Sequence, residues 1–337
     1  MHLDKEVIPI KPHKTYRQRR DLMLKNFSSL AITNVLSETI LRSGLLIISK
    51  RGRPCEIKKN KLIGYLLFAR LCGDGYEKME QDSELYLNRH YDHSNFQYHY
   101  TRLPESLIIC LTSLLEEKIK LLINEVHLHI FDSTALSTSV REERLRQGTR
   151  NKEKLTTKFH TMLGYDPPFQ LIVVEGMLAS DKHTSDAQGA RIILRDKDDI
   201  KGYGFGDSAF ETYDLIDDCI AVDIDPIFKP TIKPVKKKLS AKKQLRNIWD
   251  GNHSKLYKEI RGIGEVLYGA ATRAGLIHTN SIRTDNQNKD SLVIGLRQNL
   301  FTYLRLKALI GIIRKTRNNR NVYKPPHTIK NLHILCM

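Results

Sequence analysis

The chain has 337 residues, 40% of them hydrophobic, so it is long enough to form one large globular domain or two ordinary ones. Its 55 lysines and arginines outnumber its 38 acids, and the formal charge of +17 makes nucleic acid the leading class of partner. The start of the chain is polar and basic, and no apolar run approaches the roughly 18 residues of a membrane helix. We therefore expect a soluble, cytoplasmic protein with no signal peptide and no membrane partner.

The first part of the chain is expected to be helical. Residues 1–28 are basic and contain two prolines, which is typical of a basic arm. Apolar residues recur at spacings of three and four over 30–46, 61–72 and 104–123, and this spacing predicts helices. Pro104 suits the first turn of the third helix. Residues 29–124 are therefore expected to form a small all-helical domain that contacts DNA.

A short basic motif lies between the first two predicted helices. It consists of Arg51, Gly52, Arg53 and Pro54. Two arginines on an extended backbone can enter a narrow A·T minor groove, where the negative potential is strongest. Arg51 and Arg53 are thus candidate DNA contacts, and an ordinary basic loop between two helices is the alternative.

After residue 125 the pattern changes to that of an α/β sheet. Alternating apolar residues over 126–134 predict a strand that leads into Asp132. Residues 159–163 and 169–174 then read as a hairpin, and further strands are expected at 203–206 and 220–228. Helices are predicted over 187–194, with Asp186 as the cap, and over 213–219. The order β-β-β-α-β-α-β predicts a mixed sheet with flanking helices.

The last third of the chain is basic and mainly helical. Between residues 229 and 246 there are eight basic residues and no acid, and from 291 to the end there is again no acid. Such runs are candidate phosphate-binding segments, or else solvated faces. Helices are expected over 253–275 and 292–313. In the first run we single out these candidate DNA contacts: Lys236, Lys237, Lys238, Lys242, Lys243 and Arg246.

Three acids follow these elements in an order that suits metal chemistry. Asp132 follows the first strand, Asp207 follows the fourth, and Glu265 stands on a later helix. If the first and fourth strands are neighbours, the carboxylates can bind two hard cations about 3.5–4 Å apart, as phosphodiester chemistry requires. Arg261 lies one helical turn before Glu265 and can contact a phosphate. Taken singly, each acid also fits a cap, a turn or a solvated helix position.

These residues resemble a known family. An Asp-Ser-Thr sequence after a strand, a hairpin with Lys158 and His160, the Gly-Asp-Ser-Ala-Phe sequence around Asp207, and the helix from Tyr257 to Gly269 are similar to DDE transposases of prokaryotic insertion sequences, in the insertion-sequence four and five group. The resemblance spans about residues 125–310, with a looser likeness around 51–72. It implies an RNase H-like catalytic domain over 125–315, with 229–252 as an inserted basic loop and 316–337 as a basic tail.

The resemblance also implies a function. Asp132, Asp207 and Glu265 would bind two Mg²⁺ or Mn²⁺ ions, and the enzyme would cleave the inverted repeats at element ends and join a 3′ hydroxyl to target DNA. A homodimer on DNA, associated with the nucleoid of a prokaryotic cell, is implied as well. A nuclease of the same fold without strand transfer, and a decayed copy that only binds DNA, are the alternatives.

The helix of Glu265 departs from the family pattern in two places. The family signature is Tyr-x2-Arg-x3-Glu-x6-Lys, which Arg261 and Glu265 match. Tyr257 stands one residue too early, and Thr272 takes the lysine position with Arg273 next to it. Tyr257 and Arg273 are therefore candidate supporting residues, and Glu259 is the rival for the third acid.

Cysteines and histidines indicate no further metal site. The five cysteines are scattered and form no C-x-x-C pair, which is typical of reduced thiols in the cytosol. His90, His93 and His99 lie close together in the sequence, but their spacing fits no zinc template. We assign them to the surface.

Overall fold

The protein is described here from a computed structural model. The structure describes residues 27–45, 57–123, 126–138, 157–198, 200–231, 241–247, 249, 251–274, 276–279, 281 and 283–318. The basic arm up to residue 26, the motif with Arg51 and Arg53, the lysines 236–238 and the tail from 319 lie outside these residues. No helix in the described ranges is both long and apolar enough to cross a membrane.

The centre of the fold is a five-stranded mixed sheet, so the α/β prediction is confirmed. Its order is β4-β3-β1-β5-β6. β3 is antiparallel to both β1 and β4, whereas β5 and β6 run parallel to β1. The strands are β1 (Leu128–Ala135), β3 (Thr157–Asp166), β4 (Leu171–Asp181), β5 (Gly202–Gly206) and β6 (Ile224–Phe228).

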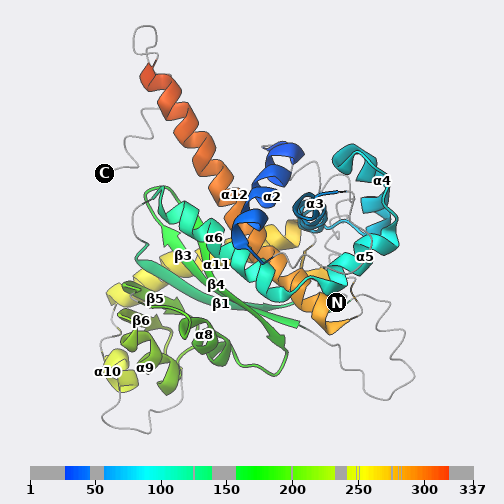
Figure 1. Cartoon of the computed structure of the whole chain (residues 1–337). Coiled ribbons are helices and arrows are strands. Elements are labelled where there is room, and N and C mark those ends of the chain that lie inside the picture. Colours follow the sequence, from blue (N-terminus) through cyan, green and yellow to red (C-terminus); the bar gives the residue numbers. More distant parts are fainter. Residues whose placement is uncertain are drawn as a thin grey trace, which may run out of the picture.

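Helices cover both faces of this sheet (Figure 1). Neighbouring residues of β1 explain why, since Ile130 belongs to the apolar cluster of one face and Phe131 to that of the other. α8 (Asp186–Leu194) and α9 (Tyr213–Ala221) pack against the Phe131 face. The Ile130 face is covered by three helices, α6 (Glu105–Lys120), α11 (Gly251–Ala274) and α12 (Thr284–Asn318).

The N-terminal helices include two that the sequence did not predict. α2 (Ser29–Ser43), α3 (Lys59–Leu71) and α6 match the expected helices. α4 (Tyr76–Leu87) and α5 (His93–Arg102) were missed because each is short and polar. α5, for example, buries only Phe96 and Tyr100, which is too few apolar positions to establish a helical period.

Several predicted boundaries were wrong. Pro104 is the N-cap of α6 and does not lie in its first turn, and Ser185, whose hydroxyl accepts from the Gln188 N–H, caps α8 in place of Asp186. β1 does not end at Asp132 but continues to Ala135, because the long strand β3 still pairs with it there. α12 begins at Thr284, eight positions before the predicted start. The first turns of α12 are polar, so the spacing of apolar residues did not predict them as helical.

Further short elements were also missed. β2 (Ser137–Thr138) pairs in parallel with β7 (His278–Thr279), and α10 (Ala241–Asn247) lies within the basic run. Two-residue strands and a seven-residue helix are too short for a periodic pattern. β2 and β7 nevertheless connect the end of β1 to the chain that leads into α12.

A buried ionic network joins the N-terminal helices to α12. The Asp290 carboxylate accepts hydrogen bonds from Arg70 of α3 and from the Tyr100 hydroxyl of α5, the latter at 2.6 Å. It also accepts from the hydroxyls of Thr279 and Ser281, both at 2.7 Å. One apolar cluster likewise runs from α2 and α3 through α12 to the sheet. The proposed domain boundary at residue 124 stays a prediction.

Candidate active site

The two predicted strand-end aspartates lie at the same edge of the sheet. β1 and β5 are parallel neighbours, with Ile130 opposite Phe205. Asp132 and Asp207 each come two residues later, so the first and fourth predicted strands bring them together as expected. The pKa of Asp132 is raised to about 6, mainly by burial of its carboxyl group and further by the charge of the Asp207 carboxylate. The two aspartates are therefore close enough to interact.

Asp132 is held on three sides. Its Oδ1 accepts from the Ser133 N–H at 2.8 Å, and the Thr161 hydroxyl of β3 donates to its backbone oxygen at 3.3 Å. From α11, Gly264 lies so close that a Cβ there would stand 3.0 Å from Asp132 Oδ2. The glycine thereby leaves room for the carboxylate oxygen. Tyr268, one turn later, meets the Thr161 hydroxyl at 2.8 Å.

Asp207 is more open and faces Arg261. Its Oδ1 accepts from the Ala209 N–H at 2.8 Å, which fixes the turn after β5. Its Oδ2 lies 3.8 Å from Arg261 Nη2, and both side chains are partly exposed, at 38% and 44%. The Tyr257 hydroxyl accepts from Arg261 Nη1 at 3.2 Å. The hydrogen bond to Tyr257 therefore orients the Arg261 side chain towards Asp207, and the guanidinium remains accessible to solvent.

Glu265 is exposed on α11. It stands one turn after Arg261, so the two residues share one side of the helix. Among the described residues, none of the three acids belongs to a group of three ligand atoms within 4.8 Å of one another. Arg273 lies eight residues further on, roughly 12 Å along the helix. The roles of Glu265 and Arg273 stay predictions.

A second layer of polar residues supports Asp132. The Asp186 carboxylate, in the first turn of α8, accepts from the Ser133 hydroxyl and pairs with Lys158 Nζ at 2.6 Å. Burial opposes ionisation of Asp186, but the hydrogen bonds from Lys158 and Ser133 hold its pKa below the ordinary value. From the sequence, Asp186 is predicted to be a helix cap, with support of the site as the alternative. Ser133 belongs to the Asp-Ser-Thr sequence after the first strand, but its bond to Asp186 was not predicted.

His160 of β3 is buried close to the charges of Lys158 and Asp186. Its Nε2 lies 2.9 Å from the Ser180 hydroxyl, and its ring packs against Gly189, where a Cβ would come within 2.3 Å of Nδ1. Burial and the charge of Lys158 lower its pKa to about 4. Asp181, in contrast, only caps the next turn through the backbone of His183 and Thr184.

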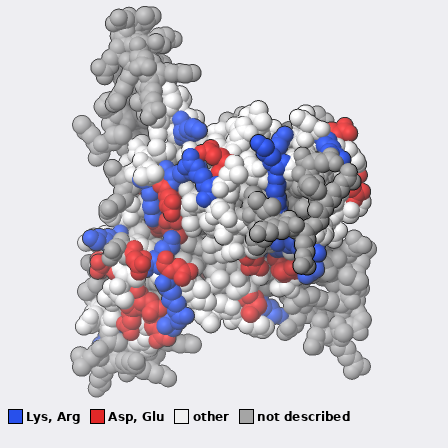
Figure 2. Space-filling model, viewed as in Figure 1, with Lys and Arg blue, Asp and Glu red and all other residues white. Residues whose placement is uncertain are grey.

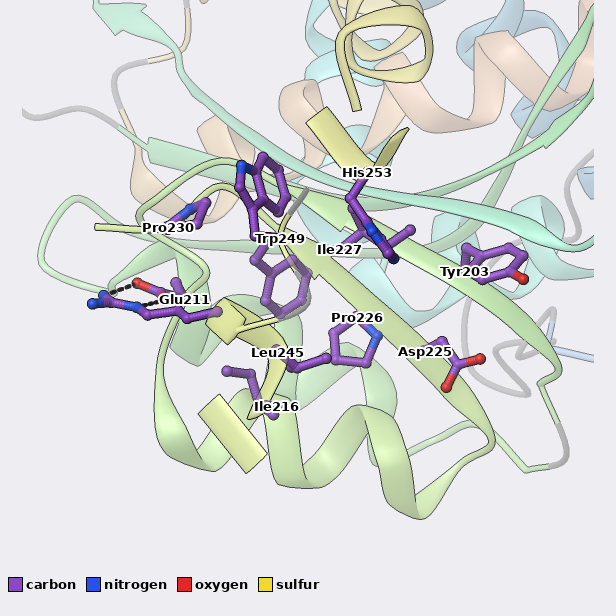
Figure 3. Close-up of a pocket in the computed structure, with 12 residues that line it drawn as sticks. Tyr203, Glu211, Ile216, Asp225, Pro226, Ile227, Pro230, Leu245, Trp249 and His253 are labelled. Atoms are coloured by element: carbon purple, nitrogen blue, oxygen red, sulfur yellow. Dashed lines mark hydrogen bonds and ion pairs between the residues drawn. The ribbon is translucent and has the colours of Figure 1, made fainter. Parts of the chain in front are cut away.

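Two candidate DNA contacts on α10 have internal partners. Arg246 pairs with Glu211 through both oxygens, one of them at 2.6 Å, and Lys242 Nζ donates to the Glu211 backbone oxygen at 2.5 Å. Lys243 is exposed on the same helix. Glu211 and Arg246 line a pocket of about 230 Å³ together with Trp249 and His253. Figure 3 shows Glu211 at one side of this pocket. DNA binding by these residues stays a prediction.

The donor set fits hard divalent cations. The aspartates supply carboxylate oxygens, which Mg²⁺ and Mn²⁺ prefer, and Gly264 places no side chain of its own against Asp132 Oδ2. The mutual repulsion of Asp132 and Asp207 is of the kind that a cation relieves. Comparisons of the chain with protein-family models and with curated proteins found no match.

Because the pKa of Asp132 is raised, its charge should lower the free energy of unfolding at high pH and not at low pH. A carboxyl whose folded pKa is about 6 contributes stability below its unfolded pKa of about 3.9, and that stability is lost as pH rises through 6. We expect Asp132→Asn to raise the melting temperature at pH 8 in metal-free buffer and to change it little at pH 4. Thermal unfolding at both values measures this. A difference in melting temperature that is the same at both pH values would contradict this prediction. Asp217→Asn, which changes an exposed acid on α9, is the control and should show no such pH dependence.

Two glycines of α11 form a matched pair. A Cβ at exposed Gly262 meets nothing within 4 Å, so Gly262→Ala should stabilise the helix by about 1 kcal/mol. Gly264→Ala has the same helical gain but presses on Asp132 Oδ2. We expect it to be less stabilising than Gly262→Ala and to lower metal-dependent activity. Denaturant unfolding and a cleavage assay test both, and equal behaviour of the two variants would argue against the close approach.

Proposed function

We propose that this chain is a Mg²⁺- or Mn²⁺-dependent DNA transposase whose catalytic part is RNase H-like. The observation that carries the proposal is the pairing of β1 with β5, which brings Asp132 and Asp207 to one edge of the sheet beside α11. The resemblance to insertion-sequence transposases requires that arrangement. The net charge of +17 suits a DNA substrate and association with the nucleoid.

In this proposal the residues have distinct roles. Asp132 and Asp207, with Glu265 as the third acid, hold two divalent cations. When bound, the cations would lower the pKa of an attacking water and stabilise the leaving 3′ oxygen. Arg261 is only loosely paired with Asp207, at 3.8 Å, so its guanidinium can turn to a phosphate of the DNA.

The Ser133–Asp186–Lys158 network keeps Asp132 in place. Ser133 donates its N–H to Asp132 and its hydroxyl to Asp186, so it couples the two carboxylates. Lys158 balances the charge of Asp186 at 2.6 Å. A metal ligand whose rotamer is fixed in this way pays less entropy on binding.

The decisive experiment uses DNA that carries the inverted repeats flanking the protein's own gene. In Mg²⁺ or Mn²⁺ we expect nicks at the repeat ends that leave 3′ hydroxyls, followed by joined products with a second DNA. Denaturing gels resolve both. Cleavage without joined products would favour the nuclease, and binding without cleavage would favour the decayed, DNA-binding copy. Cross-linking with and without the DNA tests the homodimer.

A further inference from the structure

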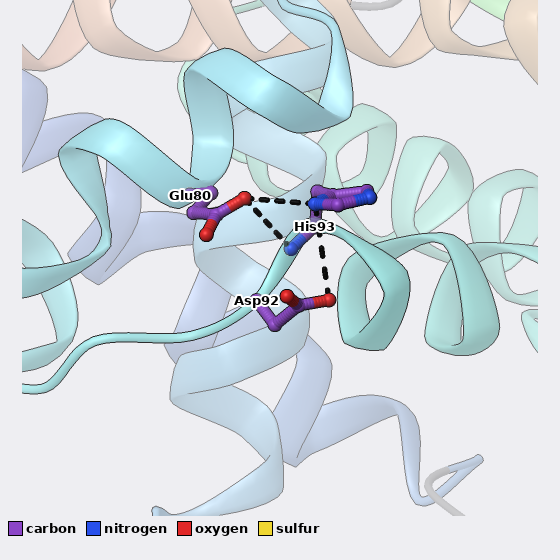
Figure 4. A group of neighbouring side chains, drawn as sticks. All are labelled: Glu80, Asp92 and His93. Carbon is purple, nitrogen blue, oxygen red and sulfur yellow. Dashed lines mark hydrogen bonds and ion pairs between the residues drawn. The ribbon is translucent and has the colours of Figure 1, made fainter.

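A second group of metal-ligating side chains lies on the N-terminal helices, away from the sheet. Glu80 of α4 extends across the connection to α5 and contacts two histidines (Figure 4 shows Glu80, Asp92 and His93). Its Oε2 lies 2.8 Å from His93 Nδ1, and its Oε1 lies 3.3 Å from His90 Nε2. His93 Nδ1 is also 3.8 Å from Asp92 Oδ1.

The connection that carries these ligands is anchored before any ion binds. The Tyr91 N–H donates to the Ser83 hydroxyl at 2.9 Å, and the Tyr91 ring packs 5.9 Å from Phe96. Asn88 ends α4 in the left-handed conformation, with φ 57°. Asp92 begins α5 by accepting the Ser94 N–H at 2.7 Å. A site on such a segment loses little conformational entropy on binding.

We propose that Glu80, Asp92 and His93, with His90 as a fourth ligand, bind a divalent transition-metal ion of the Zn²⁺ type. Ligand atoms of the first three all lie within 4.8 Å of one another. Imidazole nitrogens combined with carboxylate oxygens suit Zn²⁺, Co²⁺ or Ni²⁺, whereas Mg²⁺ prefers oxygen alone. The histidine spacing by itself fitted no zinc template, because Glu80 comes from a different helix.

The metal would replace a proton. His93 Nδ1 lies 2.8 Å from Glu80 Oε2, a hydrogen-bond distance at which a proton is held between the two atoms, and a metal bound to both would displace it. Binding therefore releases that proton and weakens on acidification. Asp92 Oδ1 accepts the capping hydrogen bond of α5, and a carboxylate with one such bond keeps further lone pairs for an ion.

Zinc binding to the full-length protein tests the site. We expect equilibrium dialysis at pH 7.5 to give one bound equivalent less for His93→Asn and for Glu80→Gln than for the unaltered chain. His99→Asn, on the same helix but outside the cluster, should bind as the unaltered chain does. Co²⁺ in place of Zn²⁺ should give a visible absorption band that these two cluster variants lose and that excess Mg²⁺ leaves unchanged.

Two outcomes of the zinc-binding experiment would contradict the proposed site. Equal zinc stoichiometry in the unaltered chain and in His93→Asn would overturn the site, as would an equal loss in His99→Asn. Circular dichroism confirms that each variant is folded, which is expected because Glu80 and His93 are partly exposed, at 26% and 52%. Asp132→Asn should leave this equivalent in place, since the site is separate from the aspartates of the sheet.

Discussion

Asp132→Asn and Asp207→Asn are each expected to lower Mg²⁺-dependent DNA cleavage by more than about a hundredfold while DNA binding persists. The magnitude follows because removing even an outer partner of a metal ligand costs about 10–100-fold, and these residues are the proposed ligands themselves. Binding should persist because it depends on the many basic residues of a chain with charge +17. Cleavage of end-bearing DNA and filter binding at several salt concentrations measure the two effects.

Glu265 has a matched control on its own helix. Glu265→Gln should lose cleavage, whereas Glu259→Gln should retain it, because Arg261 and Gly264, which contact the aspartates, lie beside Glu265 and not beside Glu259. The reverse result would make Glu259 the third acid. Normal cleavage by Asp132→Asn would refute the assignment of the whole site.

Asp132→Asn should also separate activity from stability. The same variant is expected to melt at a higher temperature at pH 8, because it removes a charge that burial and Asp207 disfavour. If the variant is more stable than the unaltered chain but inactive, Asp132 serves function at the expense of stability. A variant that is inactive because it is unfolded would melt at a lower temperature.

Asp290→Ala is expected to destabilise the protein by about 3–5 kcal/mol, the usual cost of leaving one partner of a buried ion pair uncompensated. Arg70 would lose its carboxylate, and the hydroxyls of Tyr100, Thr279 and Ser281 would lose their acceptor. Denaturant unfolding measures the change. Asp285→Ala, which removes a partly exposed acid of the same helix paired with Arg283, should cost less than about 1 kcal/mol.

The contribution of Asp290 should depend on pH in the opposite sense to that of Asp132. Burial acts to raise the pKa of Asp290, but Arg70 and the hydrogen bonds of Tyr100 and Ser281 hold it below the ordinary value. Its stabilising effect is therefore present above the unfolded pKa of about 3.9 and is lost as pH falls through the lower folded value. If Asp290→Ala costs no more than Asp285→Ala at pH 7, the network does not hold α3 and α5 on α12.

Sequence patterns gave the candidate site because its residues lie on or next to elements that can be recognised locally. The alternation that leads into Asp132 and the glycine-rich strand before Asp207 required only local residues to be recognised. The same holds for the stripe of Tyr257, Arg261 and Glu265, since residues four apart share a helix face. Patterns of this kind report which face of an element is buried, so they identify strands and helices together with the residues at their ends.

Other features depended on partners far away in the chain. The pairing of β1 with β5 joins residues more than seventy positions apart, and the Asp290 network joins α3, α5 and α12. Gly264 has a low intrinsic preference for helix, and only the fold explains its place there, since it gives room to Asp132 Oδ2. The contact of Glu80 with His93 likewise crosses two helices that have few apolar positions.

The sequence by itself determined the α/β class, the order of the main elements and the three candidate acids, because burial imposes a period that can be read locally. Only the tertiary structure decided that Asp132 and Asp207 are neighbours, that Ser133, Asp186 and Lys158 support the first of them, and that Ser185 caps α8. These depend on sheet order and on packing between distant segments. No local periodicity encodes which strand lies beside which.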